Sequence, residues 1–188
     1  IILFFRNSHI IQVKNVPPEF VKTIRDLIFW EYARLISGPA LSNSKQFPLI
    51  TNKFKELQTG QKWSEILLED INTDATKCSY CNSSDELTYD NIVPERTCHH
   101  SEIHNLVKAC KTCSTSKGNS DLIVWWGWER RDELSRIIYG KYLKMLYKCH
   151  ECKETLEQEC INMDGALDLL DLGAVFKKAC EPKRLEYR

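Results

Sequence analysis

The sequence lacks long apolar runs and contains little glycine or proline. Its longest purely apolar stretches, residues 1–5 and 122–126, have about five residues each, whereas a membrane-spanning helix needs about 18 or more. Only seven glycines and six prolines occur among 188 residues, which excludes a collagen-like repeat or a low-complexity linker. No secretory signal pattern is visible. We therefore expect a folded, intracellular, cytoplasmic protein without a membrane partner.

The sequence also lacks net charge, because Lys plus Arg and Asp plus Glu both total 26. This balance argues mildly against a partner held by bulk electrostatics alone. The charges are unevenly distributed, since residues 105–148 contain nine basic and four acidic residues, whereas residues 151–171 contain seven acidic residues and one basic residue. The first stretch is suited to binding a polyanion. A solvated helix face with mixed charges is the alternative.

Cysteine, by contrast, is abundant, with nine residues in the chain. Cys78 and Cys81 form one Cys-x-x-Cys pair, and Cys110 and Cys113 form a second. The two-residue spacer lets two thiolates converge on one ion, and two such pairs complete a tetrahedral four-cysteine site for structural Zn²⁺. A redox Cys-x-x-Cys is the alternative, but it does not need the second pair.

The remaining cysteines are harder to interpret. Cys149 and Cys152 repeat the Cys-x-x-Cys spacing, and Cys160 and Cys180 follow at irregular distances. A second zinc site and buried free thiols are both open interpretations of these four residues. We expect Cys98 to be a free thiol.

Apolar periodicity predicts helices on both sides of the first four cysteines. Pro17 and Pro18 mark the start of the first helix, and Gly38 marks its end. Residues 39–48 are rich in helix breakers and are predicted to form a loop. The other predicted helices cover residues 51–57, 64–71, 133–147 and 163–180.

The segment around the two cysteine pairs contains an ordered series of motifs. Residues 87–94 read Leu-Thr-Tyr-Asp-Asn-Ile-Val-Pro, and residues 104–118 read His-Asn-Leu-Val-Lys-Ala-Cys-Lys-Thr-Cys-Ser-Thr-Ser-Lys-Gly. With the first cysteine pair, this order resembles the zinc-stapled form of the HNH, or ββα-metal, endonuclease family. That family's pattern is similar to Cys-x-x-Cys, Asp-His-Ile-x-Pro and Asn-Leu-x-x-x-Cys-x-x-Cys-Asn-x-x-Lys-Gly. The resemblance covers roughly residues 77–126, about a quarter of the chain.

The resemblance implies an α+β fold in which a zinc-stapled ββα-metal module lies between helical flanks. The expected regions are an N-terminal helical region at residues 1–76, the module at 77–128 and a C-terminal helical region at 129–188, packed as one compact unit.

The same resemblance implies metal-dependent hydrolysis of DNA phosphodiester bonds, in restriction, defence or mobile-element roles. In the family, the aspartate at the position of Asp90 binds a divalent cation, for which Mg²⁺ or Mn²⁺ is suited. The residue at the position of Asn105 orients the active-site loop, and the residue at the position of Ser114 is a second cation ligand. The cation polarises the phosphate and stabilises the leaving oxygen.

The sequence departs from the family pattern at two of these positions. Asn91 occupies the position of the general-base histidine, and Ser114 replaces the Asn or His ligand. A carboxamide has no useful basicity, and loss of a general base typically lowers the rate by about 10² to 10⁴. We therefore expect slow or absent cleavage. His104 is the first alternative base, followed by His99 and His100.

Several residues near the motifs are candidates for contacts with DNA. Arg96, Lys111 and Lys117 are suited to phosphate contacts, with exposed solubilising side chains as the alternative. The tryptophan-rich segment at 121–128 is expected to pack in a core or interface, and base stacking is the alternative.

Two other functions stay open at this stage. The first is a catalytically degenerate, zinc-stabilised DNA-binding protein, and the second is a protein-interaction module built on the four-cysteine zinc. A homodimer is also open, because one module has one cutting site and double-strand cleavage requires two sites or two successive nicks.

Overall fold

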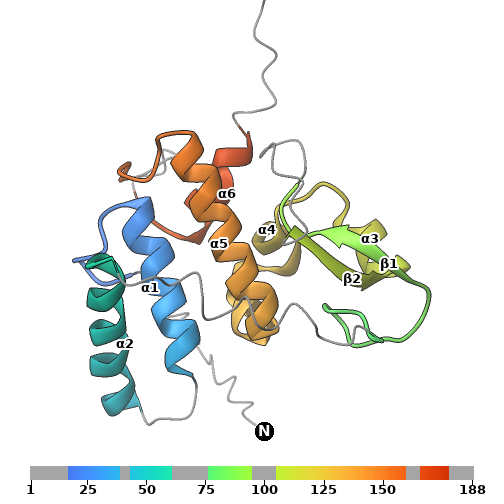
Figure 1. Cartoon of the computed structure of the whole chain (residues 1–188), viewed down its shortest axis with the longest axis horizontal. Helices are drawn as coiled ribbons and strands as arrows, with labels where there is room; N and C mark the ends of the chain where they lie inside the picture. The colour runs from blue at the N-terminus through green and yellow to red at the C-terminus, as the bar shows by residue number, and fades with distance from the viewer. Residues whose placement is uncertain (1–16, 39–42, 61–75, 95–104, 160–165, 178–188) are drawn as a thin grey trace, which may run out of the picture.

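The computed structural model describes residues 17–38, 43–60, 76–94, 105–159 and 166–177. Helices occupy one side of the molecule, and a small two-stranded sheet with a short helix occupies the other (Figure 1). In chain order, the elements are α1 (Ile24–Ser37), α2 (Asn43–Gln58), β1 (Leu87–Asn91), β2 (Leu106–Cys110), α3 (Lys111–Lys117), α4 (Leu122–Trp126), the 3₁₀ helix η3 (Trp128–Glu133), α5 (Arg136–Cys152) and α6 (Leu169–Lys177). The predicted α+β class is confirmed. Within the described ranges, no helix combines the length and the apolarity that crossing a membrane requires.

Helix α1 begins later than the paired prolines suggested. The amide of Val21 donates to the carbonyl of Pro18 at 2.8 Å, so the prolines belong to a turn. Thr23 is the N-cap, and its hydroxyl accepts from the amide of Asp26 at 3.2 Å. This bond satisfies one of the amides that a helix start leaves without an intrahelical partner. The predicted end at Gly38 is correct, with a positive φ of 68° at that residue.

Helix α2 overturns part of the predicted loop at residues 39–48. The helix starts at Asn43 and contains Pro48, although proline lacks the amide that an α-helix interior uses. Aromatic packing against α1 stabilises α2. The ring centroid of Trp30 lies 5.9 Å from that of Phe47 and 5.9 Å from that of Phe54. The predicted helix at 51–57 is the second half of α2, and the one at 64–71 lies outside the described residues.

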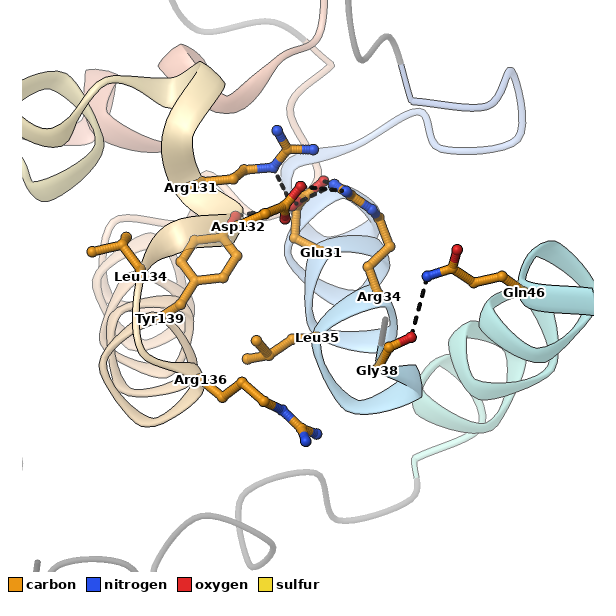
Figure 2. A pocket seen from close by; sticks show the side chains of 10 residues that line it. All are labelled: Glu31, Arg34, Leu35, Gly38, Gln46, Arg131, Asp132, Leu134, Arg136 and Tyr139. Carbon is orange, nitrogen blue, oxygen red and sulfur yellow. Dashed lines mark hydrogen bonds and ion pairs between the residues drawn. The ribbon is translucent and has the colours of Figure 1, made fainter. Parts of the chain in front are cut away.

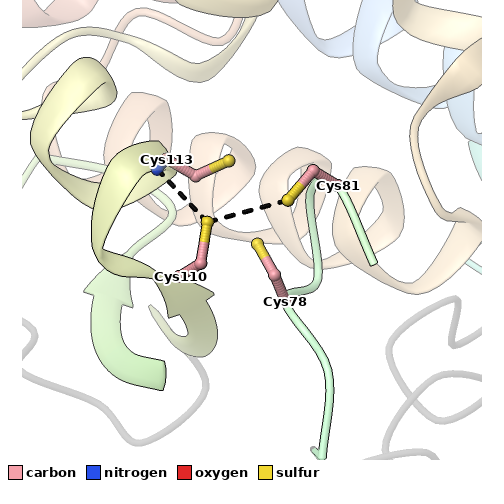
Figure 3. A group of neighbouring side chains, drawn as sticks. All are labelled: Cys78, Cys81, Cys110 and Cys113. Atoms are coloured by element: carbon pink, nitrogen blue, oxygen red, sulfur yellow. Dashed lines mark hydrogen bonds between the residues drawn. The ribbon is translucent and has the colours of Figure 1, made fainter. Parts of the chain in front are cut away.

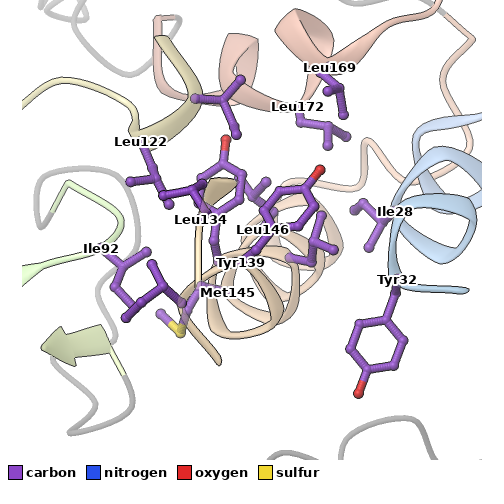
Figure 4. Packing of buried hydrophobic residues seen from close by; sticks show 14 of the residues in the cluster. Ile28, Tyr32, Ile92, Leu122, Leu134, Tyr139, Met145, Leu146, Leu169 and Leu172 are labelled. Atoms are coloured by element: carbon purple, nitrogen blue, oxygen red, sulfur yellow. The ribbon is translucent and has the colours of Figure 1, made fainter. Parts of the chain in front are cut away.

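One apolar core joins the helices to the sheet. Ile28 of α1 and Leu172 of α6 are fully buried on one side of α5, and Ile92, directly after β1, is fully buried on the side of Met145 (Figure 4). Helix α5 therefore lies between the helical part and the cysteine-rich part.

The bounds of the last two helices differ from the predicted ones. Helix α5 covers residues 136–152, displaced toward the C-terminus from the predicted 133–147, and α6 covers 169–177 of the predicted 163–180.

A buried ionic cluster ties α1 to η3 and α5. Glu31 is 4% exposed, and its carboxylate accepts from Arg131 at 3.0 Å, Tyr139 at 2.9 Å and Arg34 at 2.8 Å (Figure 2). Burial alone would raise the pKa of Glu31, but the two arginines and the tyrosine hold that pKa below its usual value. The cluster lines a pocket of about 240 Å³ between α1, α2 and the start of α5.

We predict that Arg131→Met lowers the free energy of unfolding by about 3 kcal/mol, since it removes one partner of a buried ion pair. The matched control is Lys53→Met, which breaks the exposed Lys53–Glu56 pair and should cost less than about 1 kcal/mol. Urea unfolding followed by circular dichroism measures both values. Equal losses in the two variants would contradict a stabilising role for the buried cluster.

His150 joins the end of α5 to α6. Its side chain is fully buried, with Nδ1 2.8 Å from the hydroxyl of Thr155 and Nε2 3.0 Å from the carbonyl oxygen of Leu172. Since a carbonyl can only accept, Nε2 carries the proton and Nδ1 accepts from Thr155. Burial lowers the pKa of His150 to about 4, so the folded protein holds this imidazole in its neutral form.

This burial predicts a pH-dependent stability. The unfolded chain protonates His150 near pH 6.5 and the folded chain near pH 4, so the unfolded state binds the extra proton between these values. The contribution of His150 should therefore lower the free energy of unfolding by about 2 kcal/mol as the pH falls from 7.5 to 5. Urea unfolding of the natural chain and of His150→Gln at both pH values measures the effect. The same pH difference in both proteins would refute the assignment.

Candidate functional site

The candidate site is built on the hairpin of β1 and β2 and on α3, which follows β2 directly. The strands pair antiparallel, with Asp90 opposite Val107. A tight turn precedes β1, in which the amide of Asn82 donates to the carbonyl of Cys78 at 2.9 Å and Asn82 has a φ of 61°. Asparagine adopts this left-handed conformation more readily than most residues. The amide of Ser79 donates to the carbonyl of Lys108 at 2.8 Å and so fixes the turn to β2.

This arrangement gathers the four predicted cysteines at one point (Figure 3). The sulfurs of Cys78, Cys81, Cys110 and Cys113 all lie within 4.8 Å of one another, and those of Cys81 and Cys110 are 3.6 Å apart. Four sulfurs bound tetrahedrally to zinc at about 2.3 Å would be about 3.8 Å apart. The cluster can therefore hold a metal ion such as zinc. Within the described ranges, no other group of three or more His, Cys, Asp or Glu side chains has this geometry.

The local electrostatics favour a thiolate at Cys78. Burial raises the pKa of its thiol, but backbone hydrogen bonds from Cys110, Cys81 and Tyr80 outweigh burial and lower that pKa to about 7. The thiolate is the form that binds metal. In addition, the amide of Cys113 donates to the sulfur of Cys110 at 3.4 Å.

We predict that the purified protein contains one equivalent of zinc and that Cys113→Ser loses it, because a site with three thiolates has a lower affinity for zinc than a site with four. The matched control is Cys152→Ser, since Cys152 is exposed and lies outside the cluster. Elemental analysis gives the zinc content, and thermal unfolding with and without a chelator gives its contribution to stability. Full zinc content in Cys113→Ser would contradict this assignment.

Next to the cysteines, three side chains converge on the carboxylate of Asp90, which is 8% exposed. The hydroxyl of Tyr80 donates to Oδ2 at 2.8 Å, and the hydroxyl of Ser114 donates to Oδ1 at 3.3 Å. The ammonium of Lys117 lies 3.3 Å from Oδ2. Ser114 and Lys117 are three residues apart on α3, so they lie on the same side of the helix and face β1.

Asn105 fixes the chain that follows Asp90. Its side chain accepts from the amide of Val93 and donates to the carbonyl of the same residue, both at 2.9 Å. It also lies 3.4 Å from the side-chain oxygen of Asn91, and its own carbonyl accepts from the amide of Ile92 at 2.9 Å. Asn105 thus lies beside the segment that follows Asp90, and its expected part in orienting an active-site loop stays a prediction.

The structure brings together Asp90, Asn91, Asn105 and Ser114 but places the two predicted lysines differently. Lys111 is exposed and lies 3.5 Å from Glu86. The side chain of Lys117 is 1% exposed and its ammonium lies 3.3 Å from Oδ2 of Asp90, so the phosphate contact expected of Lys117 stays a prediction. A phosphate would reach that ammonium only after the pair had separated.

The remaining candidates before Asn105 in the sequence lie outside the described residues: Arg96, Cys98, His99, His100 and His104. The same holds for Cys160 and Cys180. Cys149 is buried and disulfide-bonded, so its sulfur is not a thiolate ligand in this structure. The second zinc site therefore has no support at Cys149.

Tyr80 is a site residue that the sequence analysis missed. The residue lies between the first two cysteines, where a spacer residue has no expected role, and its ring meets that of Trp125 edge-on at 5.1 Å. Trp125 in turn donates from its indole nitrogen to the hydroxyl of Ser116 at 3.0 Å. These contacts agree with the expected packing role of the tryptophan-rich segment.

The oxygen donors at Asp90 and Ser114 are of the kind that Mg²⁺ and Mn²⁺ prefer. The positive charge beside them, however, belongs to Lys117, so a cation bound at Asp90 would have to take the place of the ammonium.

No protein-family model, curated protein or solved structure matches this chain.

Proposed function

We propose that this chain is a zinc-stapled endonuclease of the HNH type that hydrolyses DNA phosphodiester bonds. The observation that supports this proposal best is the contact between Asp90 of β1 and Ser114 of α3, whose side-chain oxygens lie 3.3 Å apart beside the cysteine cluster. A carboxylate from a strand and an oxygen donor from the following helix form a compact site for an anionic substrate and its cation.

Each residue of the site has a distinct part in this proposal. Asp90 and Ser114 would hold Mg²⁺ or Mn²⁺, and the chemistry that such an ion would supply is Lewis-acid stabilisation of the charge on the phosphate. Asn105 keeps Asn91 at the edge of the site through its bonds to the neighbouring main chain. Asn91 orients a water molecule but cannot accept its proton.

The charge distribution supports DNA as the partner. Lys111, at the start of α3, is exposed and belongs to the basic stretch at residues 105–148. Lysines that neutralise phosphates make binding tighter at low salt, since counterions are released from the DNA. The excess of basic residues at 105–148 therefore agrees with a nucleic-acid substrate although the whole chain has no net charge.

Two observations favour a second candidate function, a DNA-binding protein without catalysis. Asn91 lacks a basic nitrogen, and the carboxylate of Asp90 is already ion-paired to Lys117. Such a protein would bind DNA without added Mg²⁺, and its affinity would fall steeply with salt.

We predict that Asn91→His raises the rate of plasmid nicking in Mg²⁺ or Mn²⁺ by about 10² to 10⁴, because it restores a general base. Adding Ser114→Asn should increase the rate further, since it supplies a stronger cation ligand. Relaxation of supercoiled plasmid, followed on agarose gels, measures the three rates.

The control is the double variant Asn91→His with Asp90→Asn, which keeps the added histidine and loses the carboxylate. It should be inactive. If every version leaves the plasmid intact but still shifts it in a gel, the DNA-binding function replaces the nuclease.

A further inference from the structure

The ammonium of Lys117 lies against the carboxylate of Asp90, to which a divalent cation would also have to bind. It lies 3.3 Å from Oδ2 of Asp90 and donates to the main-chain oxygen of Asn91 at 2.5 Å. Lys117 is 1% exposed and Asp90 8% exposed. A lysine is seldom buried this completely unless an acidic partner compensates its charge.

The contacts of Asp90 leave little room for a further cation. Its Oδ2 atom accepts from Tyr80 and lies against Lys117, and its Oδ1 atom accepts from Ser114. All three neighbours present hydrogen atoms to the carboxylate, whereas a metal ion would require lone pairs at the same place. An ammonium and a divalent ion in contact with one carboxylate would also repel each other.

We propose that Lys117 is an internal cation that competes with a divalent metal ion for the carboxylate of Asp90. The proposal rests on the proposed function only in taking Asp90 as the cation ligand. In the free protein, the ammonium neutralises the buried carboxylate, and a divalent ion binds only by displacing it. The apparent affinity for the ion is then lowered by the strength of the Lys117–Asp90 pair.

The position of Lys117 on α3 favours displacement over rearrangement of the hairpin. The residue lies in the last turn of the helix, and Gly118 ends the helix with a φ of 50°. The amide of Gly118 donates to the carbonyl of Ser114 at 2.8 Å. Displacing the ammonium therefore requires rotation of the Lys117 side chain and loss of its bond to the carbonyl of Asn91, while the main chain of Ser114 stays held in the helix.

The test measures Mn²⁺ binding to the zinc-loaded protein by electron paramagnetic resonance, which detects the free ion and requires no catalysis. Lys117→Met keeps the apolar stem and removes the charge. We expect it to bind Mn²⁺ at least about tenfold more tightly than the natural chain, because a competing like charge is absent. The double variant Lys117→Met with Asp90→Asn should lose this gain.

Thermal unfolding supplies a second readout. Lys117→Met leaves Asp90 without its counter-charge, so its melting temperature should fall in the absence of Mn²⁺ and recover as Mn²⁺ is added. The natural chain should respond much less to the same additions. Lys117→Gln, which can still donate to Asp90 and to the carbonyl of Asn91, serves if the methionine variant does not fold.

Equal Mn²⁺ affinity in the natural chain and in both Lys117 variants would overturn the proposal. A gain in Mn²⁺ affinity in Lys117→Met that persists when Asp90→Asn is added would also overturn it. Failure of the nuclease is a separate result, because it appears as intact plasmid with Asn91→His while Lys117→Met still gains Mn²⁺ affinity.

Discussion

The convergence of four cysteine sulfurs is the constraint on which the site depends. Two sulfurs come from the turn before β1, and two come from the junction of β2 and α3. A two-stranded hairpin alone is at best marginally stable in water, and α3 has only seven residues. A metal ion bound by all four thiolates would join the turn, the hairpin and the helix into one unit. Asp90 and Ser114 face each other only if these pieces hold together.

The second support of the site is the core that α5 shares with both halves of the molecule. Ile92, immediately after Asn91, is fully buried in this core, so the end of β1 is anchored to the helices as well as to the cysteines. Asp121 extends the connection, because its half-buried carboxylate caps α4 and accepts from the hydroxyl of Tyr142 on α5 at 2.7 Å. The helical flanks therefore position the site in addition to stabilising the chain.

Local spacing made part of this structure predictable. The spacing of the two Cys-x-x-Cys pairs predicted the cysteine cluster, and the structure brings the four sulfurs together. Asp90, Asn105 and Ser114 were expected in one site because of the family resemblance, and the structure places Ser114 against Asp90 and Asn105 against Asn91. Helix α2 was missed at its start, because Pro48 normally breaks a helix and the packing that offsets it involves another helix.

The ionic contacts were not predictable for a related reason. Lysines are mostly exposed, and only the fold shows that Lys117 meets a carboxylate 27 positions earlier in the chain. The partners in the Glu31–Arg131 pair are separated by 100 positions. No pattern in a single sequence indicates which distant charges meet in a core.

Amide hydrogen exchange with and without zinc tests the central claim most directly, since it reports how firmly each segment is folded. The account predicts that zinc removal strips protection from β1, β2 and α3, whereas α1 and α5 stay protected. Unchanged protection of the hairpin in the zinc-free protein would contradict the claim that the four cysteines hold the site together.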